Sequence, residues 1–170
     1  MLEMVIYGVS FDLVGKQPIV LLRTADGNKF LPIWIGHPEA AAILMKLQNA
    51  STPRPMTHDL VTDMLEQLDA TVVRITVTEL RESTFYASIT VQTNGTEIEI
   101  DSRPSDAIAL AIRADAPIFA DERVIEESAV EFENETDEEM VAEFRSFLDN
   151  VSPDEFASGG DDEEEEEGSP

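Results

Sequence analysis

The residues from 71 to 101 alternate between apolar and polar side chains, and this period of two constrains the fold more than any other feature of the chain. One run covers residues 71–78 and a second covers residues 85–91, with a short turn between them. Asn94-Gly95 then supplies the two positive-φ positions that a tight hairpin needs, and a third run follows it. Strands that follow one another through short turns predict an antiparallel sheet.

The N-terminal part of the chain adds strands to this sheet. Residues 1–9 and 19–22 have strand patterns, and an Asp-Gly turn predicts a hairpin between the second of them and residues 30–35. This last run is apolar on both faces, which is typical of a central strand. Trp34 lies in it, so we expect this side chain to pack in the core rather than to stack on a nucleobase.

Three segments have the period of helices. One starts near Pro38, which suits the first helical position, and a second starts near Thr57, a candidate N-cap. A small, apolar helix covers residues 107–114, and residues 117–120 after it resemble a short edge strand. The predicted fold class is therefore α+β, with a mixed, largely antiparallel sheet and three packed helices.

The composition changes near residue 125 and defines the expected domains. Residues 1–125 should form the folded domain, and residues 126–135 an acidic linker. Residues 136–156 form an expected amphipathic helical appendage, whose apolar face should dock on the core or on a protein partner. Residues 157–170 are small, polar and acidic, so we expect a disordered acidic tail.

The net charge of -25 is concentrated in this C-terminal part. Ten lysines and arginines face seventeen acidic residues through Ile125, whereas one arginine faces nineteen acidic residues from Glu126 onward. The folded domain thus lacks the strong positive charge that is typical of nucleic-acid binding, and any such activity must be local or metal-assisted.

The chain has no cysteine, which excludes disulfides, thiolate zinc sites and a cysteine nucleophile. The N-terminal residues lack the pattern of a signal peptide, and no apolar run approaches the length of a membrane span. We therefore expect a cytoplasmic protein without a membrane partner.

The densest polar cluster lies at a predicted strand-to-helix corner and contains Asp101, Arg103, Ser105 and Asp106. In one interpretation these residues only support the fold: a serine caps the helix, Asp106 favours the helix dipole and Arg103 ties the loop to a carboxylate. In the other, Asp101 and Asp106 bind a divalent cation, while Arg103 and Ser105 bind a phosphate. Oxygen ligands suit Mg²⁺ or Mn²⁺, which commonly assist phosphodiester hydrolysis.

A second cluster, Arg54, His58 and Asp59, lies at the start of the second predicted helix. His58 could be a general acid or base, with Asp59 as a catalytic or metal-binding carboxylate and Arg54 as a phosphate contact. The simpler alternative is a partly exposed histidine in a first helical turn, without a chemical role.

Three segments of the chain resemble the bifunctional nuclease (BFN) domain family: LPIWIGHPEAAAI, MTHDLVTDMLEQL and IDSRPSDAIALAIRADAPIFAD. The resemblance covers roughly residues 1–125. It implies a compact, oligomeric α+β domain and, for some members, degradation of both RNA and DNA with little sequence preference. It supplies no agreed catalytic set, so the site residues above are inferred from their chemistry.

These observations lead to two hypotheses. The first is a metal-assisted nuclease with His58, Asp59 and Asp106 as catalytic residues, Arg54, Arg103 and Ser105 as substrate-binding residues, and Asp59, Asp101 and Asp106 as metal ligands. The second is a non-enzymatic regulatory or protein-interaction module of the same fold. In both, we expect a homo-oligomer.

Overall fold

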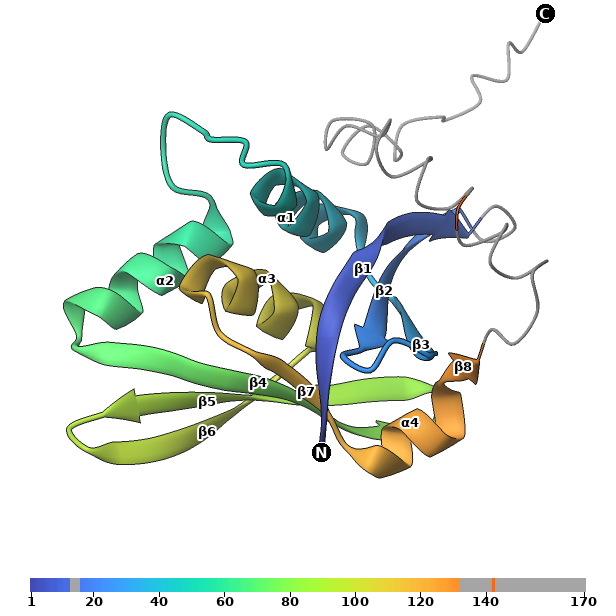
Figure 1. The fold of residues 1–170 in the computed structure, drawn as a ribbon. Coiled ribbons are helices and arrows are strands. Elements are labelled where there is room, and N and C mark those ends of the chain that lie inside the picture. The colour runs from blue at the N-terminus through green and yellow to red at the C-terminus, as the bar shows by residue number, and fades with distance from the viewer. Residues whose placement is uncertain (13–15, 132–141, 143–170) are drawn as a thin grey trace, which may run out of the picture.

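The computed structural model describes residues 1–12, 16–131 and 142 (Figure 1). Its main feature is one eight-stranded sheet with the order β6-β5-β4-β7-β1-β2-β3-β8. The strands are β1 (Leu2–Asp12), β2 (Gln17–Thr24), β3 (Lys29–Trp34), β4 (Ala70–Arg81), β5 (Thr84–Thr93), β6 (Thr96–Ser102), β7 (Ile118–Ala120) and β8 (Val130–Glu131). The helices are α1 (His37–Leu47), α2 (Thr57–Gln67), α3 (Pro104–Ala114) and α4 (Glu122–Ser128). The predicted fold class, α+β with a mixed, largely antiparallel sheet, is confirmed.

The tight turns give the sheet its hairpins. Asn94 and Gly95 both have positive φ, 49° and 75°, and join β5 to β6 as their residue types predict. Gly27, at φ 96°, lies in the turn between β2 and β3. The β4–β5 turn also uses two positive-φ residues, Glu82 and Ser83, although neither is a glycine. All three hairpins are antiparallel.

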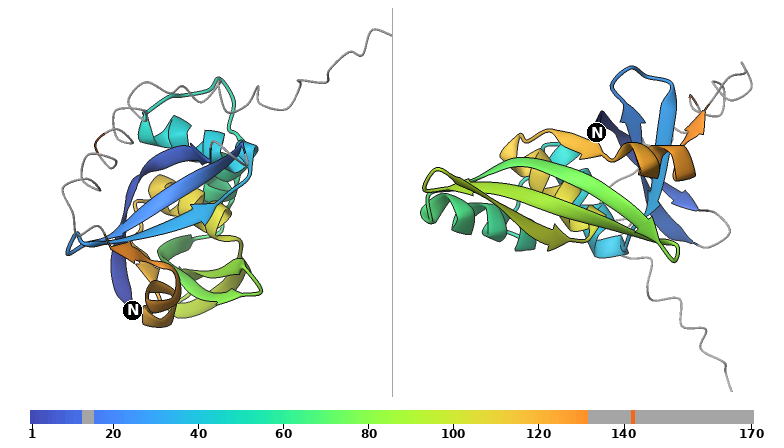
Figure 2. Two further views of the ribbon diagram at one scale, coloured as in Figure 1. Left: turned by 90° about the vertical axis from the view of Figure 1, so that its right-hand side faces the viewer. Right: turned by 90° about the horizontal axis from the view of Figure 1, so that it is seen from below.

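Strand β7 corrects one expectation from the sequence. Residues 117–120 resembled an edge strand, but β7 lies inside the sheet, parallel to β4 and antiparallel to β1. Its short, apolar sequence suits this position, since Ile118 and Ala120 are buried. Figure 2 shows that the strands on the two sides of β7 run in clearly different directions, so the sheet is strongly twisted.

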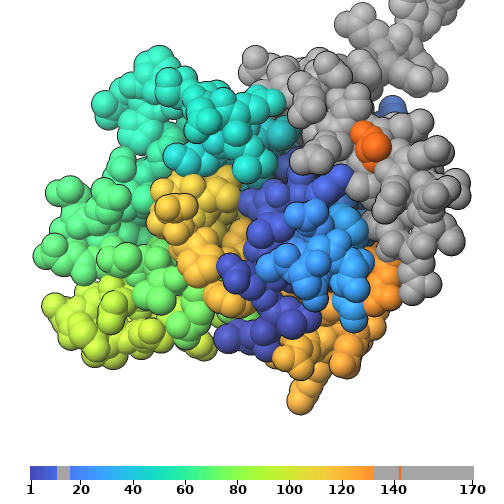
Figure 3. Space-filling view, viewed as in Figure 1, coloured from blue at the N-terminus to red at the C-terminus, as the bar shows by residue number. Residues whose placement is uncertain are grey.

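Helix α3 lies at the centre of the molecule. It contacts α1 and α2 on one side and β4 and β5 on the other, and the space-filling view shows its surface between these elements (Figure 3). Seven of its eleven residues are buried. The small side chains of its Ala-Ile-Ala-Leu-Ala run explain this, because they let neighbouring helices and strands approach closely.

Helix α2 is less buried than its sequence indicates. Val61 and Leu65 pack against the core, but Leu60, Met64 and Leu68 are 50%, 53% and 69% exposed. The helix also starts one residue earlier than expected: its N-cap is Met56 rather than Thr57. Only part of the apolar face of α2 is therefore buried against the core, and the rest of it is exposed.

The folded region extends beyond the boundary expected at residue 125. Asp121 caps α4 by accepting a hydrogen bond from the Arg123 N–H, and Val124 and Ile125 are buried. The chain then forms β8, which pairs with β3. Residues 126–131 therefore belong to the domain rather than to an acidic linker, while the expected appendage and tail lie outside the described residues, apart from Ala142.

Candidate functional site

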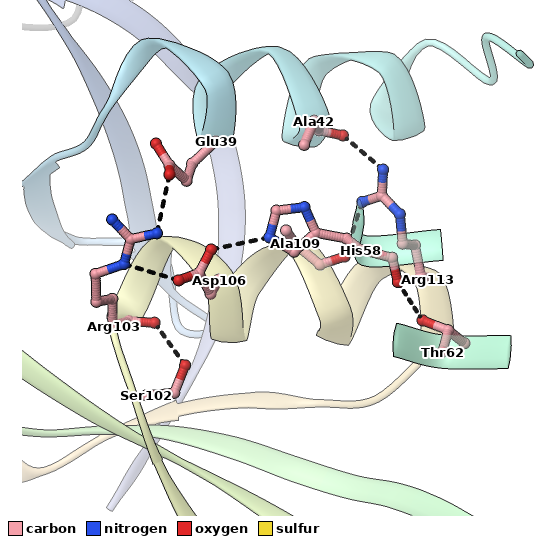
Figure 4. Close-up of polar contacts among 9 residues, drawn as sticks. All are labelled: Glu39, Ala42, His58, Thr62, Ser102, Arg103, Asp106, Ala109 and Arg113. Atoms are coloured by element: carbon pink, nitrogen blue, oxygen red, sulfur yellow. Dashed lines mark hydrogen bonds and ion pairs between the residues drawn. The ribbon is translucent and has the colours of Figure 1, made fainter. Parts of the chain in front are cut away.

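The predicted corner joins the end of β6 to the start of α3 (Figure 4). Arg103 is the N-cap residue and Pro104 begins the helix, where its fixed φ fits and no N–H is needed. The expected serine cap is absent: no side chain caps α3, and the Ser102 hydroxyl donates instead to the Arg103 carbonyl oxygen at 2.9 Å. Ser105 is buried, so the corner keeps its shape through packing as well as hydrogen bonds.

A chain of four side chains connects the first turns of three helices. The His58 Nε2 and Asp106 Oδ1 atoms lie 2.9 Å apart. The other Asp106 oxygen accepts a hydrogen bond from Arg103 Nε at 2.8 Å, and Arg103 Nη2 donates to Glu39 Oε1 at 2.9 Å. We call Glu39, Arg103, Asp106 and His58 the polar chain; Figure 4 shows it running from α1 through α3 to α2.

The charges in the polar chain stabilise one another. Burial opposes ionisation of Asp106, but the hydrogen bonds from Arg103 and His58 outweigh it and lower the pKa of this carboxyl group. The hydrogen bonds from Arg103 to Asp106 and Glu39 likewise raise the pKa of the guanidinium. Asp106 is therefore an anion at neutral pH, while His58, only 12% exposed, is held against it.

Arg113 forms a second connection between the helices, one that the sequence did not reveal. Its Nε donates to Asp59 Oδ1 at 2.7 Å, and its two other nitrogens donate to the carbonyl oxygens of Ala109 and Ala42 at 2.9 and 3.1 Å. The side chain is only 7% exposed. The sequence feature that could have indicated this contact is an arginine at the end of an otherwise apolar helix. A buried arginine needs a hydrogen-bonding or charged partner.

Asp59 is thereby assigned to this structural contact. One oxygen binds Arg113, and the other accepts a hydrogen bond from the Met56 N–H at 2.9 Å at the start of α2. Burial raises the pKa of Asp59, but these hydrogen bonds more than compensate and leave it lowered. Asp59 and His58 are neighbours in sequence, yet their side chains bind different partners on α3.

Two cavities lie beside the residues singled out from the sequence, and Arg103 is the member of the polar chain that appears in the lining of one of them. The larger, of about 520 Å³, includes Arg54, Asp59 and Arg113 in its lining. The smaller, of about 330 Å³, includes Arg103, Ser105 and Trp34.

The expectation that Trp34 packs in the core is wrong. Trp34 is the last residue of β3, and it lies at the surface, where it is 50% exposed.

The expected metal ligands do not form one group. Asp101 is exposed on β6 opposite Ser88, whereas both oxygens of Asp59 and of Asp106 bind N–H donors. Within residues 1–12 and 16–131, no three histidine, aspartate or glutamate side chains are arranged to hold a metal ion. The donors as arranged do not fit a shared divalent cation.

The same part of the chain contains no helix that is long and apolar enough to cross a membrane.

Comparison with known proteins identifies the domain. The family profile described as "Bifunctional nuclease domain" matches residues 20–133. An "Uncharacterized protein" of Mycobacterium tuberculosis is 39% identical over 162 residues, which are 91% of this chain and 97% of that protein.

Two plant proteins match over a shorter part of the chain. "Bifunctional nuclease 1" of Oryza sativa subsp. indica is 30% identical over 109 residues, which are 62% of this chain and 33% of the plant protein. "Bifunctional nuclease 1" of Arabidopsis thaliana is 28% identical over 108 residues, with 61% and 33% covered. The profile match, which spans more than half of the sequence and includes the polar chain, shows that this chain belongs to the bifunctional nuclease domain family.

Proposed function

We propose that this protein is a nuclease that hydrolyses RNA and DNA phosphodiesters with little sequence preference. The observation that carries the proposal is the His58–Asp106 pair beside Arg103. A carboxylate bound to one nitrogen of an imidazole orients the ring and fixes which nitrogen faces the substrate. The other ring nitrogen, Nδ1, can then exchange a proton with the reacting groups.

In the proposed reaction, His58 acts as the general base. Nδ1 accepts a proton from a water molecule, the water oxygen bonds to phosphorus, and the bond from phosphorus to the leaving oxygen breaks. The proton then passes from His58 to the leaving oxygen or to solvent. Water as the nucleophile explains how one site could act on DNA, which lacks a 2′-hydroxyl.

Arg103 is the proposed phosphate ligand beside this base. Its side chain is 66% exposed, and Nε and Nη2 bind Asp106 and Glu39. These two hydrogen bonds fix the orientation of the guanidinium, and its third nitrogen, Nη1, can bind an incoming phosphate oxygen. Arg54, exposed on the loop before α2, is the second proposed phosphate contact. Two such contacts predict a weak salt dependence, with a slope of about -1.4 in log binding constant against log salt for a single strand.

The divalent metal ion expected from the sequence stays a prediction. A metal requirement would mean that Asp59 or Asp106 exchanges its present partners, or that the exposed Asp101 joins them, when substrate binds. Cleavage assays in Mg²⁺, in Mn²⁺ and in excess chelator test this directly, since the His58–Asp106 base predicts residual cleavage in chelator.

The decisive experiment compares Asp106→Asn with Asp63→Asn. Asp63 is an exposed carboxylate on α2 outside the polar chain, so its removal changes the net charge equally. Asp106→Asn should lower the cleavage of single-stranded RNA and DNA by about 10²- to 10⁴-fold, while Asp63→Asn should cleave as the unmodified protein does. Equal activity of both variants, or activity that separates from the protein on a second column, would show that the proposed site is wrong.

The alternative proposal is a non-enzymatic regulatory or protein-interaction module. It is favoured by the exposed apolar side chains of α2, which exceed what an isolated domain needs. Full-length protein and a form ending at residue 131 should then both lack nuclease activity. Loss of a stable protein partner on truncation would assign the contact to residues 136–156, and a partner kept by both forms would assign it to the α2 face. The truncation point follows β8, so it spares the sheet.

Homo-oligomerisation and a cytoplasmic location also stay predictions. Sedimentation analysis tests the first, with the α2 face as the proposed contact between two copies. Fractionation of the source cells tests the second.

A further inference from the structure

The smaller cavity has the chemistry of a nucleobase site. Its lining comes from the ends of β2 and β3, the β4–β5 turn and the start of α3: Gln17, Ile33, Trp34, Ser83, Thr84, Phe85, Arg103, Pro104 and Ser105. The volume of about 330 Å³ is at the small end of ligand pockets. A cavity of this size suits one base rather than a longer segment of substrate.

Two aromatic side chains enter the lining of this cavity. Trp34 is 50% exposed, although it ends a strand whose preceding residue, Ile33, is buried. Phe85, at the start of β5, is partly buried against the core. An exposed indole at a fixed strand end is costly in water, whereas a flat base stacked on it would cover apolar surface without requiring any particular sequence.

The lining includes one guanidinium that can contact an anion next to the base, while two of its nitrogens bind Asp106 and Glu39. Among the described residues that line the cavity, Arg103 is the one with a charged side chain, in a protein whose net charge is -25. The remaining polar groups are hydroxyls and an amide, which can bind base edges of any identity. Aromatic surface beside an arginine is the combination by which single strands are bound without sequence preference.

The part of the lining that comes from the β4–β5 turn also has an unusual conformation. Ser83, which lines the cavity, and Glu82 before it both have positive φ, at 62° and 49°, without being glycine, asparagine or aspartate. Such residues cost conformational energy and persist where the surrounding structure holds them. The hydrogen-bonded ends of β4 and β5 hold this turn, so the cavity has a preformed wall.

We propose that this cavity binds one base of a single-stranded nucleic acid, stacked on Trp34, with a neighbouring phosphate on Arg103. The proposal rests on the proposed nuclease function for its ligand class and extends that function to residues outside the polar chain. It also gives a physical reason for low sequence preference, because stacking accepts every base.

Trp34 is the only tryptophan in the chain, so its fluorescence reports on this cavity alone. The probe is a thymidine oligonucleotide of about eight residues, long enough for a single-strand site, with phosphorothioate linkages that resist cleavage. Titration of the full-length protein should quench the fluorescence in a saturable manner. An unchanged spectrum at probe concentrations that shift the anisotropy of a labelled oligonucleotide would overturn the proposal.

Variants separate stacking from a structural role of the indole. Trp34→Ala should weaken binding of the labelled oligonucleotide by roughly 5- to 150-fold, the usual effect of losing one stacked base, and Trp34→Phe should restore most of it. Tyr86→Ala is the matched control, because Tyr86 is an aromatic residue of β5 that contacts Arg81 outside the cavity. Equal binding by Trp34→Ala and Tyr86→Ala would contradict the proposal.

The outcomes distinguish this proposal from the nuclease itself. Quenching without cleavage would support the base site and contradict catalysis. Cleavage that is insensitive to Trp34→Ala, with no quenching, would support catalysis and reject the base site.

Discussion

His58 Nε2 lies 2.9 Å from Asp106 Oδ1, joining the first turns of α2 and α3 across 48 positions of sequence. Because Asp106 also binds Arg103, the carboxylate connects an imidazole to a guanidinium, and both groups depend on its negative charge. The substitution Asp106→Asn removes this charge and keeps the shape of the side chain, so it tests whether the site depends on the Asp106 carboxylate.

Asp106→Asn should lower kcat by about 10²- to 10⁴-fold, the range typical of lost general acid–base catalysis. The free energy of unfolding should change by less than about 1 kcal/mol, since the contacts are partly exposed. Steady-state cleavage and urea unfolding measure the two effects. A loss of activity that parallels a loss of folded protein would contradict the catalytic role.

Stability should decrease as the pH falls below about 4. The pKa values of Asp59 and Asp106 are both lowered from 3.8 in the folded protein, so the unfolded chain binds their protons first. Their contribution to stability is thus complete above the unfolded pKa and is lost as the pH falls through the folded pKa values. Urea unfolding of the parent and Asp106→Asn should show a smaller pH dependence in the variant; parallel curves would be inconsistent with the lowered pKa.

Arg113→Met should destabilise the fold more than any change in an exposed arginine. The substitution keeps an unbranched side chain but leaves Asp59 and two carbonyl oxygens without their donor. We expect a loss of about 2–3 kcal/mol, below the value for a fully buried pair because Asp59 is partly exposed. Arg81→Met, which removes an exposed contact with Glu79, is the control and should leave urea unfolding unchanged.

Gly36→Ala should affect activity more than stability. Gly36 precedes α1, and an added methyl group would overlap the Glu39 carboxylate, the group that binds Arg103. The carboxylate can rotate away, so the fold survives, but Arg103 loses one of its two anchors. Gly27→Ala gives the opposite pattern, because its φ of 96° disfavours any side chain, while nothing lies within 4 Å of the added methyl group. That control should lose about 1–2 kcal/mol of stability and keep its cleavage rate.

Leu60→Glu should test the α2 face as a contact between copies. The side chain is half exposed in the single chain, so the charge should be tolerated in the monomer. If α2 pairs with a second copy, sedimentation should show a shift to the monomer. An oligomer that survives the substitution would assign the contact to another surface.

Local structure follows from the sequence, whereas the site depends on contacts that the sequence does not reveal. Asn94-Gly95 predicts its hairpin because the turn needs positive φ at both positions. Arg113 could not be paired with Asp59 in advance, since the two lie on different helices and 54 positions apart. A one-residue bulge after Val72 likewise buries Val72 and leaves Val73 only partly buried, although Val73 shares the alternation of Ile75 and Val77.

Trp34 and α2 differ from expectation for a related reason. An apolar pattern indicates which side chains can be buried. How many of them are buried depends on how many other elements of the fold pack against that segment. Trp34 lies at the last position of β3, where the chain leaves the sheet, and α2 lies at the side of the helical layer. In both places the fold has fewer partners than the pattern allows.

The position of β7 affects the order in which the protein can assemble during synthesis. In the sheet, β1–β3 and β4–β6 meet only through β7, which lies between β4 and β1. The three residues of β7 follow α3 in the sequence. The strands β1–β3 and β4–β6 therefore leave the ribosome before the strand that joins them. The sheet therefore remains in two parts until residues 118–120 arrive, and its closure depends on contacts between distant parts of the chain, the slow class of folding event.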